Sequence, residues 1–476
     1  MADRPGARLE EPRPQLSPAA RQARGKAIRR AVPRESQAVF DARPDRRDPV
    51  AQLQQQGQSR LADLLPIRYG RMLASPLAYY RGAALPMAAD LARTPATGLI
   101  AQLCGDAHLS NFGMFASPER RLVFDINDFD ETLPGPWEWD VKRLAASLEI
   151  AGRVNGFGDR LRRRIVTQTA AHYRLAMRRL AGLGNLDVWY SSGDVDALAA
   201  QYRSVLGKRE QALAGRALGP PDDERRELAG LVSSGHGPPR ILASPPLVMP
   251  ADQLTAQEPG LAAWLHQIVA SYRESLEPSR RYLIRQFQVA DLARRVSGVG
   301  SVGLRCWIVL LTGRASGDLL FLQVKQAQQS VLSAYAGTSR YASHGERVVA
   351  GQRLMQVASD MFLGWQSAGP QRAAPLAGPQ TDYYVRQLRD WKFSVASADM
   401  RPAVMLAYGA LCGRTLARAH ARTADRIAIA AYLGKSAAFD SAVTEFAARY
   451  ARQNERDYQA LQAAVSAGRL PAQTGI

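Results

Sequence analysis

The sequence of 476 residues contains little lysine, little cysteine and no long apolar run. Its three cysteines, Cys104, Cys306 and Cys412, lie far apart, without the short spacings of a zinc site or a redox pair. The longest compact apolar run extends only from about Cys306 to Leu311, so no segment predicts a transmembrane helix. The N-terminal residues are rich in arginine and proline, whereas a secretion signal requires an apolar segment. We therefore expect buried, reduced thiols and a cytoplasmic protein without membrane insertion.

The basic charge of the chain comes almost entirely from arginine. Only six of the 62 lysine and arginine residues are lysine, and the net charge is +19. Such a charge attracts phosphate-rich partners, so nucleic acid binding is one functional alternative. Residues 1–55 have the composition of a basic arm, and we expect them to be largely disordered. The arm has almost no lysine and no interleaved aromatic residues, which makes nucleic acid the less favoured partner.

Periodicity divides the rest of the chain into helical and β-rich parts. Apolar residues recur at helical spacing in residues 60–92 and 137–215, before a glycine- and proline-rich connection at about 215–258. Residues 282–395 change to short β-branched and apolar runs around glycine turns, and helices follow. The sequence therefore predicts an α+β protein of two lobes with an N-terminal extension. We place a helical lobe at 56–275, a β-rich lobe at 276–398 and helices that complete the helical lobe at 399–476.

The segment GDAHLSNFG is the most informative stretch of the sequence. It places Asp106, His108 and Asn111 in a loop after an apolar run. Phosphoryl transfer requires a carboxylate that orients the attacking hydroxyl and accepts its proton, and an amide oxygen that binds magnesium. Asp106 and Asn111 have a spacing that suits these two tasks. The strand-like LVFDIND then leads to Asp128 and Asp130, which offer further oxygen ligands for magnesium.

This pattern resembles the catalytic loop G-D-x-H-x-x-N of the kinase-like small-molecule phosphotransferases, which include the aminoglycoside and choline kinases. The matching residues are Gly105, Asp106, His108 and Asn111. The resemblance implies a protein-kinase-like fold that binds ATP and Mg²⁺, with Asp106 as catalytic base and Asn111 as metal ligand. His108 belongs to the same catalytic loop, and we assign it a hydrogen-bonding role without proton transfer.

The resemblance also bears on which carboxylates bind metal. In that family a helical aspartate about twelve residues beyond the metal-binding aspartate supports the catalytic loop, and Asp140 lies twelve positions after Asp128. This spacing favours Asp128, with Asp130 beside it. The interval from Asp106 to Asp128 is, however, a few residues longer than is usual in the family. Asp125 fits that interval better and stays an alternative metal ligand.

The parts that should bind the nucleotide follow this loop in the sequence. Gly298, Gly300 and Gly303 match G-x-G-x-x-G and precede a β-branched run, which is typical of a glycine turn that covers phosphates between two strands. Lys325 lies in the apolar segment LFLQVKQA, where a buried ammonium requires an anionic partner. The resemblance implies that Lys325 contacts the phosphates and pairs with a helical glutamate, for which Glu346 is the candidate. A surface lysine and an exposed helix-terminal acid are the plain alternatives.

The order of these parts departs from the kinase pattern, because the catalytic loop precedes the glycine turn and the lysine. We interpret this order as a circular permutation of the two lobes. The segment LAYGALCGRTLARAHART resembles the helix that precedes the catalytic loop in small-molecule kinases, and we expect it to pack beside Asp106. In the folded protein, Lys325 should face Asp128 across a cleft.

From about residue 66 to 458 the chain resembles the bacterial family named domain of unknown function 2252, through PIRYGRMLASP, QLCGDAHLSNFG, GVGSVG and LFLQVKQA. We expect an ATP- and Mg²⁺-dependent phosphotransferase that moves the γ-phosphoryl group to a hydroxyl of a small molecule. Nucleotidyl transfer, or ATP binding without turnover, fits the same residues, and a basic nucleic-acid-binding protein is the second alternative. Tyr79, Tyr80 and Arg81 either line the acceptor side or form a core aromatic pair with a surface arginine.

Overall fold

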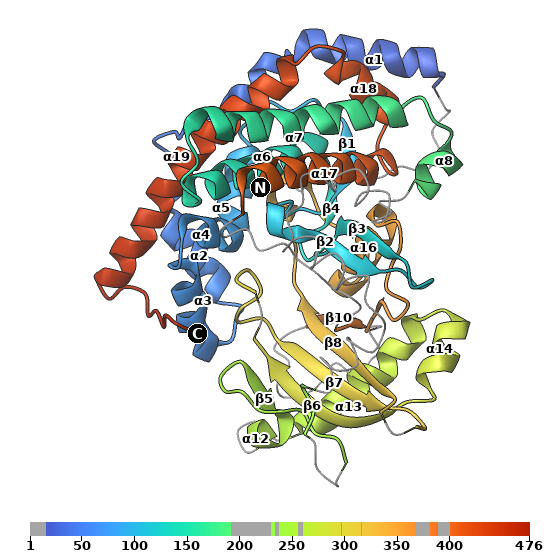
Figure 1. Cartoon of the computed structure of the whole chain (residues 1–476). Coiled ribbons are helices and arrows are strands. Elements are labelled where there is room, and N and C mark those ends of the chain that lie inside the picture. The colour runs from blue at the N-terminus through green and yellow to red at the C-terminus, as the bar shows by residue number, and fades with distance from the viewer. Residues whose placement is uncertain are drawn as a thin grey trace.

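The computed structural model of the chain contains both helices and sheets. It describes residues 16–191, 230–233, 238–255, 260–296, 298–315, 317–366, 381–388 and 400–476. Most helices lie at one end of the molecule and a six-stranded sheet lies at the other, as Figure 1 shows. The predicted α+β class is therefore confirmed, whereas about half of the predicted connection at 215–258 lies outside the described residues. No helix in the described ranges is long and apolar enough to cross a membrane.

The helical lobe combines segments from the first and last parts of the chain. Its α-helices are α1 (Pro18–Ala31), α2 (Pro49–Gly57), α3 (Leu65–Met72), α4 (Pro76–Gly82), α5 (Ala84–Leu91), α6 (Trp137–Val154), α7 (Asp159–Leu180), α8 (Asn185–Tyr190), α17 (Pro402–Ala421), α18 (Arg426–Leu433) and α19 (Ala438–Ser466). Its antiparallel strand pairs are β1 (Ile100–Leu103) with β4 (Leu133–Pro136), and β2 (Phe112–Ala116) with β3 (Leu122–Ile126). The strands therefore carry the predicted catalytic loop on a helical base.

Helices α6, α7 and α17 form the centre of the helical lobe. Every residue of α6 from Trp137 to Gly152 is buried, and the Trp137 ring stacks on Tyr173 of α7 with centroids 5.5 Å apart. Helix α17 approaches α7 closely at Gly413, where a Cβ atom would lie only 2.3 Å from the carbonyl oxygen of Thr169. Because α6 is buried on all sides, its charged side chains need partners inside the protein.

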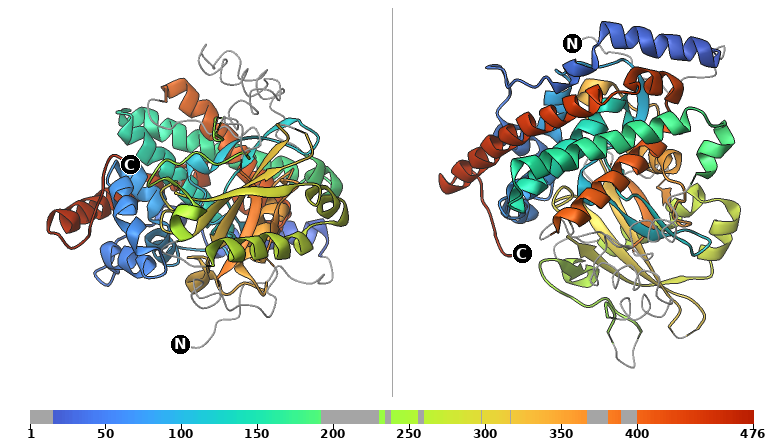
Figure 2. Two further views of the ribbon diagram at one scale, coloured as in Figure 1. Left: turned by 90° about the horizontal axis from the view of Figure 1, so that it is seen from below. Right: turned by 45° about the horizontal axis from the view of Figure 1, so that its top comes forward.

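The sheet lobe is an antiparallel sheet with the strand order β5-β6-β7-β8-β10-β9. Its strands are β5 (Val248–Pro250), β6 (Gln288–Arg295), β7 (Cys306–Thr312), β8 (Leu319–Ala327), β9 (Gly364–Trp365) and β10 (Asp382–Gln387). Four helices accompany the sheet, namely α12 (Ala251–Thr255), α13 (Leu261–Tyr272), α14 (Pro278–Ile284) and α16 (His344–Met355), and a short helix α15 (Ser333–Ala336) follows β8. Helix α13 packs on one face of the sheet through a separate apolar core, as the two views in Figure 2 help to show.

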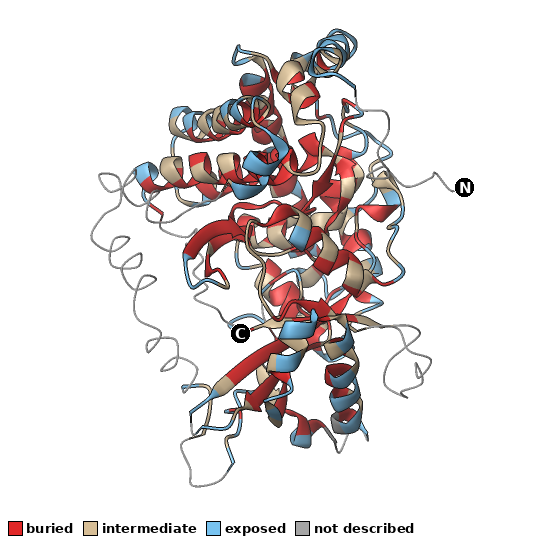
Figure 3. Ribbon diagram, turned by 90° about the vertical axis from the view of Figure 1, so that its right-hand side faces the viewer, coloured by how far each residue is buried: buried red, intermediate tan, exposed pale blue. Residues whose placement is uncertain are grey.

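The predicted boundary between the lobes at residue 276 is wrong. Strand β5 pairs with β6, and Leu265 and Ile268 of α13 belong to the core of the sheet lobe, so this lobe begins before residue 276. The two lobes also share apolar packing, because Val349 of α16 and Tyr384 of β10 belong to the main core of the helical lobe. Figure 3 shows buried residues in both lobes and exposed residues mainly on the outer helices.

The predicted disorder of residues 1–55 is also wrong from residue 18 onward. Helix α1 packs against α18, where a Cβ atom at Gly25 would collide with the carbonyl oxygen of Ala428. Arg46 then bridges Asp90 and Asp457, with a distance of 2.8 Å from its Nε to Asp90 Oδ1. The composition of the arm misled the prediction because glycine and arginine make these contacts, with little apolar surface of their own. Residues 1–15 lie outside the described ranges.

Candidate functional site

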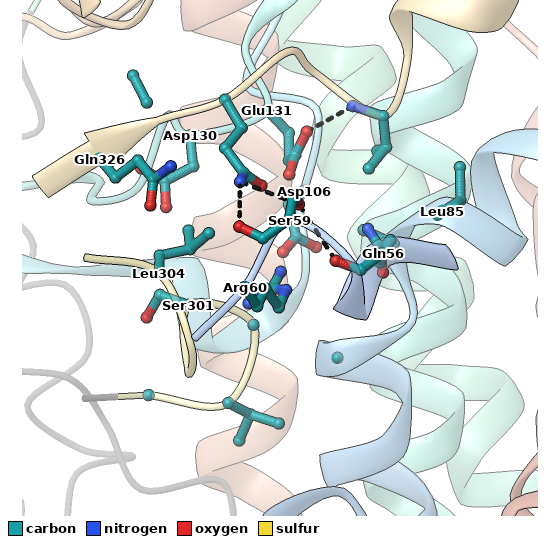
Figure 4. Close-up of a pocket in the computed structure, with 18 of the residues that line it drawn as sticks. Gln56, Ser59, Arg60, Leu85, Asp106, Asp130, Glu131, Ser301, Leu304 and Gln326 are labelled. Carbon is teal, nitrogen blue, oxygen red and sulfur yellow. Dashed lines mark hydrogen bonds between the residues drawn. The ribbon is translucent and has the colours of Figure 1, made fainter. Parts of the chain in front are cut away.

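A pocket of about 860 Å³ lies between the helical lobe and the sheet lobe. Its walls come from five segments: the loop after β1, the loop after β3, the turn between β6 and β7, the end of β8 and the N-terminal helices. Residues that line it include Gln56, Ser59, Arg60, Arg68, Arg81, Asp106, His108, Asn111, Asp128, Asp130, Glu131, Gly298, Gly300, Ser301, Gln326 and Gln328. Figure 4 shows several of these side chains around the same hollow. The structure therefore brings the two distant groups of predicted site residues to one place.

The loop that carries Asp106 is held by the buried helix α6. The Asp140 carboxylate accepts hydrogen bonds from the amides of Cys104 at 2.9 Å and Gly105 at 3.1 Å. Gly105 has a φ of +83°, and a Cβ atom there would lie 2.2 Å from the carbonyl oxygen of Glu131, so only glycine fits. Asp140 thus has the loop-supporting position that the resemblance implied.

Asp140 is in turn connected to His420 and Tyr173, two residues that the sequence did not single out. His420 of α17 places its Nε2 atom 3.3 Å from Asp140 Oδ2, and its Nδ1 atom lies 2.9 Å from the Tyr173 hydroxyl. Helix α17 also reaches the loop directly, because the Tyr408 hydroxyl donates to the carbonyl of Leu109 at 2.8 Å. The predicted packing of this helix beside the Asp106 loop is therefore present in the structure.

Arg143 of α6 is the partner of Asp106, and no pattern in the sequence singled it out. Its Nε atom lies 2.5 Å from Asp106 Oδ1, and its guanidinium lies over the Tyr80 ring at 4.4 Å from the centroid. Burial alone would lower the pKa of the Arg143 guanidinium, but Asp106 outweighs burial and raises this pKa above its ordinary value. Arg143 therefore fixes one oxygen of Asp106 and leaves Oδ2 for another contact.

His108 is a buried structural residue of the loop. Its backbone amide donates to the Asp106 carbonyl at 2.7 Å, and its own carbonyl accepts from the Asn111 amide at 2.8 Å. Burial lowers the pKa of His108 to about 4, with Asp106 acting in the opposite direction, so the imidazole is neutral at pH 7. Its Nε2 atom lies 3.7 Å from Asp106 Oδ2. The Nδ1 atom is buried without a hydrogen-bond partner among the described residues, so the predicted hydrogen-bonding role of the side chain stays a prediction.

Among the predicted metal ligands, Asn111 and Asp128 are the best placed to bind a cation. Asn111 donates through Nδ2 to the Asp106 carbonyl at 2.7 Å, which leaves its Oδ1 atom as a possible ligand. Asp128 is about one third exposed and lines the same pocket. Across the described ranges, no three His, Cys, Asp or Glu side chains converge as a ready-made metal site. Amide and carboxylate oxygens nevertheless suit Mg²⁺, which often takes one or two protein ligands and completes its shell with phosphates and water.

Lys325 contacts the predicted metal-binding loop at the edge of the pocket, where the lysine itself is buried. Its Nζ atom lies 3.6 Å from Asp128 Oδ2 and in closer contact with Asp130 Oδ2, although the lysine and the two acids come from distant parts of the sequence. Burial alone would lower the pKa of the Lys325 ammonium, but Asp128 and Asp130 outweigh burial and hold this pKa well above its ordinary value. Asp130 also accepts a hydrogen bond from the Tyr384 hydroxyl at 2.7 Å. Asp130 is therefore engaged in holding Lys325, which makes it a weaker candidate for metal than Asp128.

The predicted pair of Lys325 with Glu346 does not form among the described residues. The Glu346 backbone amide donates to Ser343 Oγ at the start of α16, and the next residue, Arg347, is the one that turns inward. Arg347 donates to the carbonyl of Thr132 at 2.6 Å and also bonds the Asp130 carbonyl. The register of helix α16 turns Arg347, and not Glu346, toward the loop that carries Asp128 and Asp130. These two carboxylates are therefore the anionic partners of Lys325.

Asp125, the alternative metal ligand, is a buried structural residue. It is fully buried, and its Oδ1 atom lies 2.8 Å from Nη2 of Arg418. Its Oδ2 atom accepts a hydrogen bond from the Val357 amide at 2.9 Å. Asp125 does not line the pocket. Asp125 is therefore a weaker candidate for metal than Asp128.

Arginine side chains of the helical lobe donate hydrogen bonds to carbonyl groups of the glycine turn between β6 and β7. Arg71 donates to the carbonyl of Gly298 at 2.6 Å, and Arg68 donates to that of Gly300 at 3.2 Å. Gly298 and Gly303 have φ values of +69° and +88°, which other residues adopt only with strain. The predicted strand–turn–strand arrangement of the glycines is present, and Gly298 and Gly300 line the pocket.

The three residues that the sequence offered for the acceptor side separate into two groups. Tyr79 and Tyr80 are buried in the apolar cores, and each has 1% of its surface exposed. Arg81 lines the pocket instead of the outer surface. The aromatic pair is therefore structural, and Arg81 remains a candidate for contact with a ligand.

Comparison with known proteins gives a family and no function. No curated protein and no solved structure matches the chain. One family model, described as an uncharacterized protein conserved in bacteria, matches residues 60–464. This match extends over the catalytic-loop segment, the carboxylate loop, the glycine turn and Lys325, and it begins at the pocket residue Arg60. The chain belongs to the bacterial family named domain of unknown function 2252.

Proposed function

We propose that this protein is an ATP- and Mg²⁺-dependent phosphotransferase that moves the γ-phosphoryl group to a hydroxyl of a small molecule. One observation carries the proposal. Asp106 and Asn111, from the helical lobe, line the same pocket as Asp128, whose carboxylate faces Lys325 of the sheet lobe at 3.6 Å. Phosphoryl transfer requires a carboxylate for the attacking hydroxyl, oxygen ligands for magnesium and a cation for the phosphates. The carboxylate and the oxygen ligands line the pocket, and the cation, Lys325, is buried directly behind Asp128 and Asp130.

The chemistry assigns a separate task to each side chain. Asp106 accepts the proton of the acceptor hydroxyl through Oδ2, while Arg143 holds its Oδ1. The hydroxyl oxygen forms a bond to the γ-phosphorus as the bond from that phosphorus to the bridging oxygen breaks, and ADP leaves. Asn111 and Asp128 would hold the magnesium that neutralises the phosphates, and Lys325 would bind a phosphate oxygen at the cost of its contact with Asp128. No covalent intermediate with the protein is required.

The proposed fold is a protein-kinase-like fold with its two lobes permuted. Three features support it: Lys325 lies on a central strand of an antiparallel sheet, a glycine turn joins two strands of that sheet, and α17 packs beside the Asp106 loop from the far end of the chain. An exchange of chain order with retained packing is expected of a circular permutation, because the core contacts do not depend on where the chain is cut.

The decisive experiment uses ATP labelled at either the α or the γ phosphorus, with Mg²⁺ and a bacterial metabolite extract. We expect the γ label alone to appear in a small-molecule product, and we expect Asp106→Asn to lower this transfer by about a hundredfold or more. Asp187, an exposed aspartate on α8, provides the matched control Asp187→Asn, which should retain full transfer. Transfer of the α label would establish nucleotidyl transfer instead. Bound ATP with no transfer of either label would establish a regulatory ATP-binding protein.

Lys325 provides an independent test of the nucleotide side. We expect Lys325→Met to weaken the binding of a non-hydrolysable ATP analogue by about tenfold or more, because a charge-assisted contact with phosphate is lost. Calorimetry in the presence of Mg²⁺ measures this affinity. Lys435, a residue after α18 outside the pocket, provides the control Lys435→Met. An unchanged affinity in Lys325→Met would remove the main support for the permuted arrangement.

A further inference from the structure

The wall of the pocket nearest the N-terminal helices carries three arginines, Arg60, Arg68 and Arg81, which we call the arginine wall. Within the described part of the chain, none of them has a carboxylate within ion-pair distance. This differs from the rest of the site, where Asp106 pairs with Arg143, and Asp128 and Asp130 pair with Lys325. Acidic groups of the pocket act on the three guanidinium groups only from beyond ion-pair distance among the described residues, so this wall keeps unpaired positive charges that attract an anion.

Arg81 has the most unused hydrogen-bonding capacity of the three. Its side chain makes no hydrogen bond or ion pair with any described residue, and its Nε atom is buried. Burial lowers the pKa of the Arg81 guanidinium, with Asp106 and Asp128 acting in the opposite direction, and it stays charged at pH 7. A charged group with buried donors and no acceptor is costly in a folded protein, so such a group commonly waits for a ligand.

Arg60 and Arg68 already donate some hydrogen bonds within the protein. Their remaining N–H groups decide whether each can also bind a ligand. Arg68 is almost fully buried and donates to the carbonyls of Gly300 and Gly82 and to Gln56 Oε1. Arg60 donates only to the carbonyl of Val302, at 2.5 Å, which leaves most of its five N–H groups available. Arg68 therefore holds the glycine turn in place, whereas Arg60 and Arg81 can bind a ligand.

The position of Arg81 indicates which ligand carries the anion. Arg81 follows Tyr80, whose carbonyl accepts a hydrogen bond at 3.1 Å from Arg143, the partner of Asp106. Arg81 therefore lies near Asp106, beside which the acceptor hydroxyl must lie if Asp106 is the base, and its own carbonyl lies near Gly300 of the glycine turn. The lysine that would bind the nucleotide phosphates lies on the sheet side. An anionic group beside Arg81 is within reach of the molecule that Asp106 orients.

We infer that Arg60 and Arg81 bind an acidic group, a phosphate or a carboxylate, of the acceptor, so that the acceptor is an anionic alcohol such as a sugar phosphate or a hydroxy acid. The identity of the bound molecule as the acceptor rests on the proposed phosphotransfer. The anion subsite itself does not depend on turnover. Arginine suits this task because its planar fork binds phosphate and carboxylate oxygens in pairs.

The first experiment measures the subsite without any reaction. Inorganic phosphate is titrated into the wild-type protein, Arg81→Gln, Arg81→Lys and the control Arg164→Gln, which alters an exposed arginine of α7. A second titration uses a non-hydrolysable ATP analogue with Mg²⁺. We expect Arg81→Gln to weaken phosphate binding by about tenfold or more, Arg81→Lys to weaken it less, and all variants to keep the affinity for the ATP analogue within about twofold.

The outcomes separate the two sources of phosphate. Equal losses for phosphate and the ATP analogue in Arg81→Gln would assign the arginine wall to the nucleotide and overturn the inference. Absence of phosphate binding in the wild type, or unchanged binding in Arg81→Gln, would overturn it as well. Circular dichroism and thermal unfolding of each variant confirm that the compared proteins are folded.

The second experiment identifies the acceptor class with matched pairs of compounds, such as glycerol with glycerol 3-phosphate, ribose with ribose 5-phosphate, and glycerol with glycerate. We expect transfer of the γ label to the anionic member of a pair and loss of that preference in Arg81→Gln. Preference for the neutral members would overturn the inference while leaving the phosphotransferase intact. Arg81-dependent phosphate binding without transfer to any compound would leave the subsite standing and refute the proposed function.

Discussion

The charged residues on one side of the pocket form ion pairs, whereas the arginines on the other side form none with the described residues. On the carboxylate side, Asp106 lies 2.5 Å from Arg143, and Lys325 contacts both Asp128 and Asp130. On the arginine wall, Arg60 and Arg68 bond only to neutral oxygen atoms, and Arg81 bonds to no described residue. Paired charges hold loops in position, whereas charges without counter-ions reduce stability until a ligand arrives. The difference separates the scaffold of the site from its binding surface.

The largest expected effect comes from removing one arginine from each side. Arg143→Gln should lower the free energy of unfolding by about 3 kcal/mol, because Asp106 then keeps its charge without a partner. Arg81→Gln, in contrast, should change it by about 0.5 kcal/mol or less, or even raise it, since no ion pair is broken. Urea unfolding at pH 7 measures both values. Similar losses in the two variants would show that Arg81 is structural and would remove the distinction between the two sides.

A second comparison sharpens the roles of two neighbouring carboxylates. Asp125→Asn should destabilise the protein by about 3 kcal/mol, because Arg418 loses its buried partner, while the magnesium requirement of the remaining folded protein stays unchanged. Asp128→Asn should leave stability nearly unaltered and raise the Mg²⁺ concentration needed for half-maximal label transfer. Thermal unfolding and magnesium titrations of transfer measure the two effects. An altered magnesium requirement in Asp125→Asn would restore Asp125 as a ligand.

His108 should make the loop that carries Asp106 sensitive to acid. Its folded pKa of about 4 lies below the ordinary value of 6.5, so the unfolded chain binds more protons between these values. Stability should therefore fall as the pH is lowered, by about 2 kcal/mol between pH 7 and pH 5 from this residue. Unfolding experiments should show a weaker pH dependence in His108→Gln than in the wild type. The exposed His266 provides the control His266→Gln, which should retain the full dependence.

The smallest effect is expected far from the pocket, on helix α1. Arg24, Lys26 and Arg30 are exposed there, and reversing all three charges should leave label transfer within about twofold of the wild type. The same variant tests nucleic acid binding. Tight, salt-sensitive RNA binding by the wild type that disappears in this variant would make nucleic acid the principal partner. Reversal of the exposed Arg160, Arg164 and Arg179 on α7 controls for the loss of net charge.

Much of the candidate site could be predicted because its residues stand in short segments with a local pattern. The spacing in GDAHLSNFG identified Asp106, His108 and Asn111, and all three line one pocket. A lysine within an apolar strand identified Lys325, since an ammonium there must find an anion. The pairing partner was assigned wrongly, because helix α16 could be predicted from sequence but the residue it turns inward could not.

Arginine was the main source of error. With 56 arginines in the chain, composition alone could not distinguish those that line the pocket from those on the surface. Arg143, Arg347 and the arginine wall each gain their role from contacts with segments that lie far away in the sequence. The arm predicted to be disordered also reaches the pocket, because its last residue, Gln55, lies on helix α2 and lines the pocket wall.

The sequence by itself determined the α+β class, the loop with Asp106 and Asn111, the glycine turn and the anionic surroundings of Lys325. These features depend on local periodicity, on backbone conformation and on the cost of burying a single charge. Only the tertiary structure decided that Asp125 is buried against Arg418, that Arg143 holds Asp106, and that Arg81 faces the pocket with no hydrogen-bond or ion-pair partner among the described residues. The physical reason is that the role of a charged side chain depends on whether folding brings a counter-charge to it.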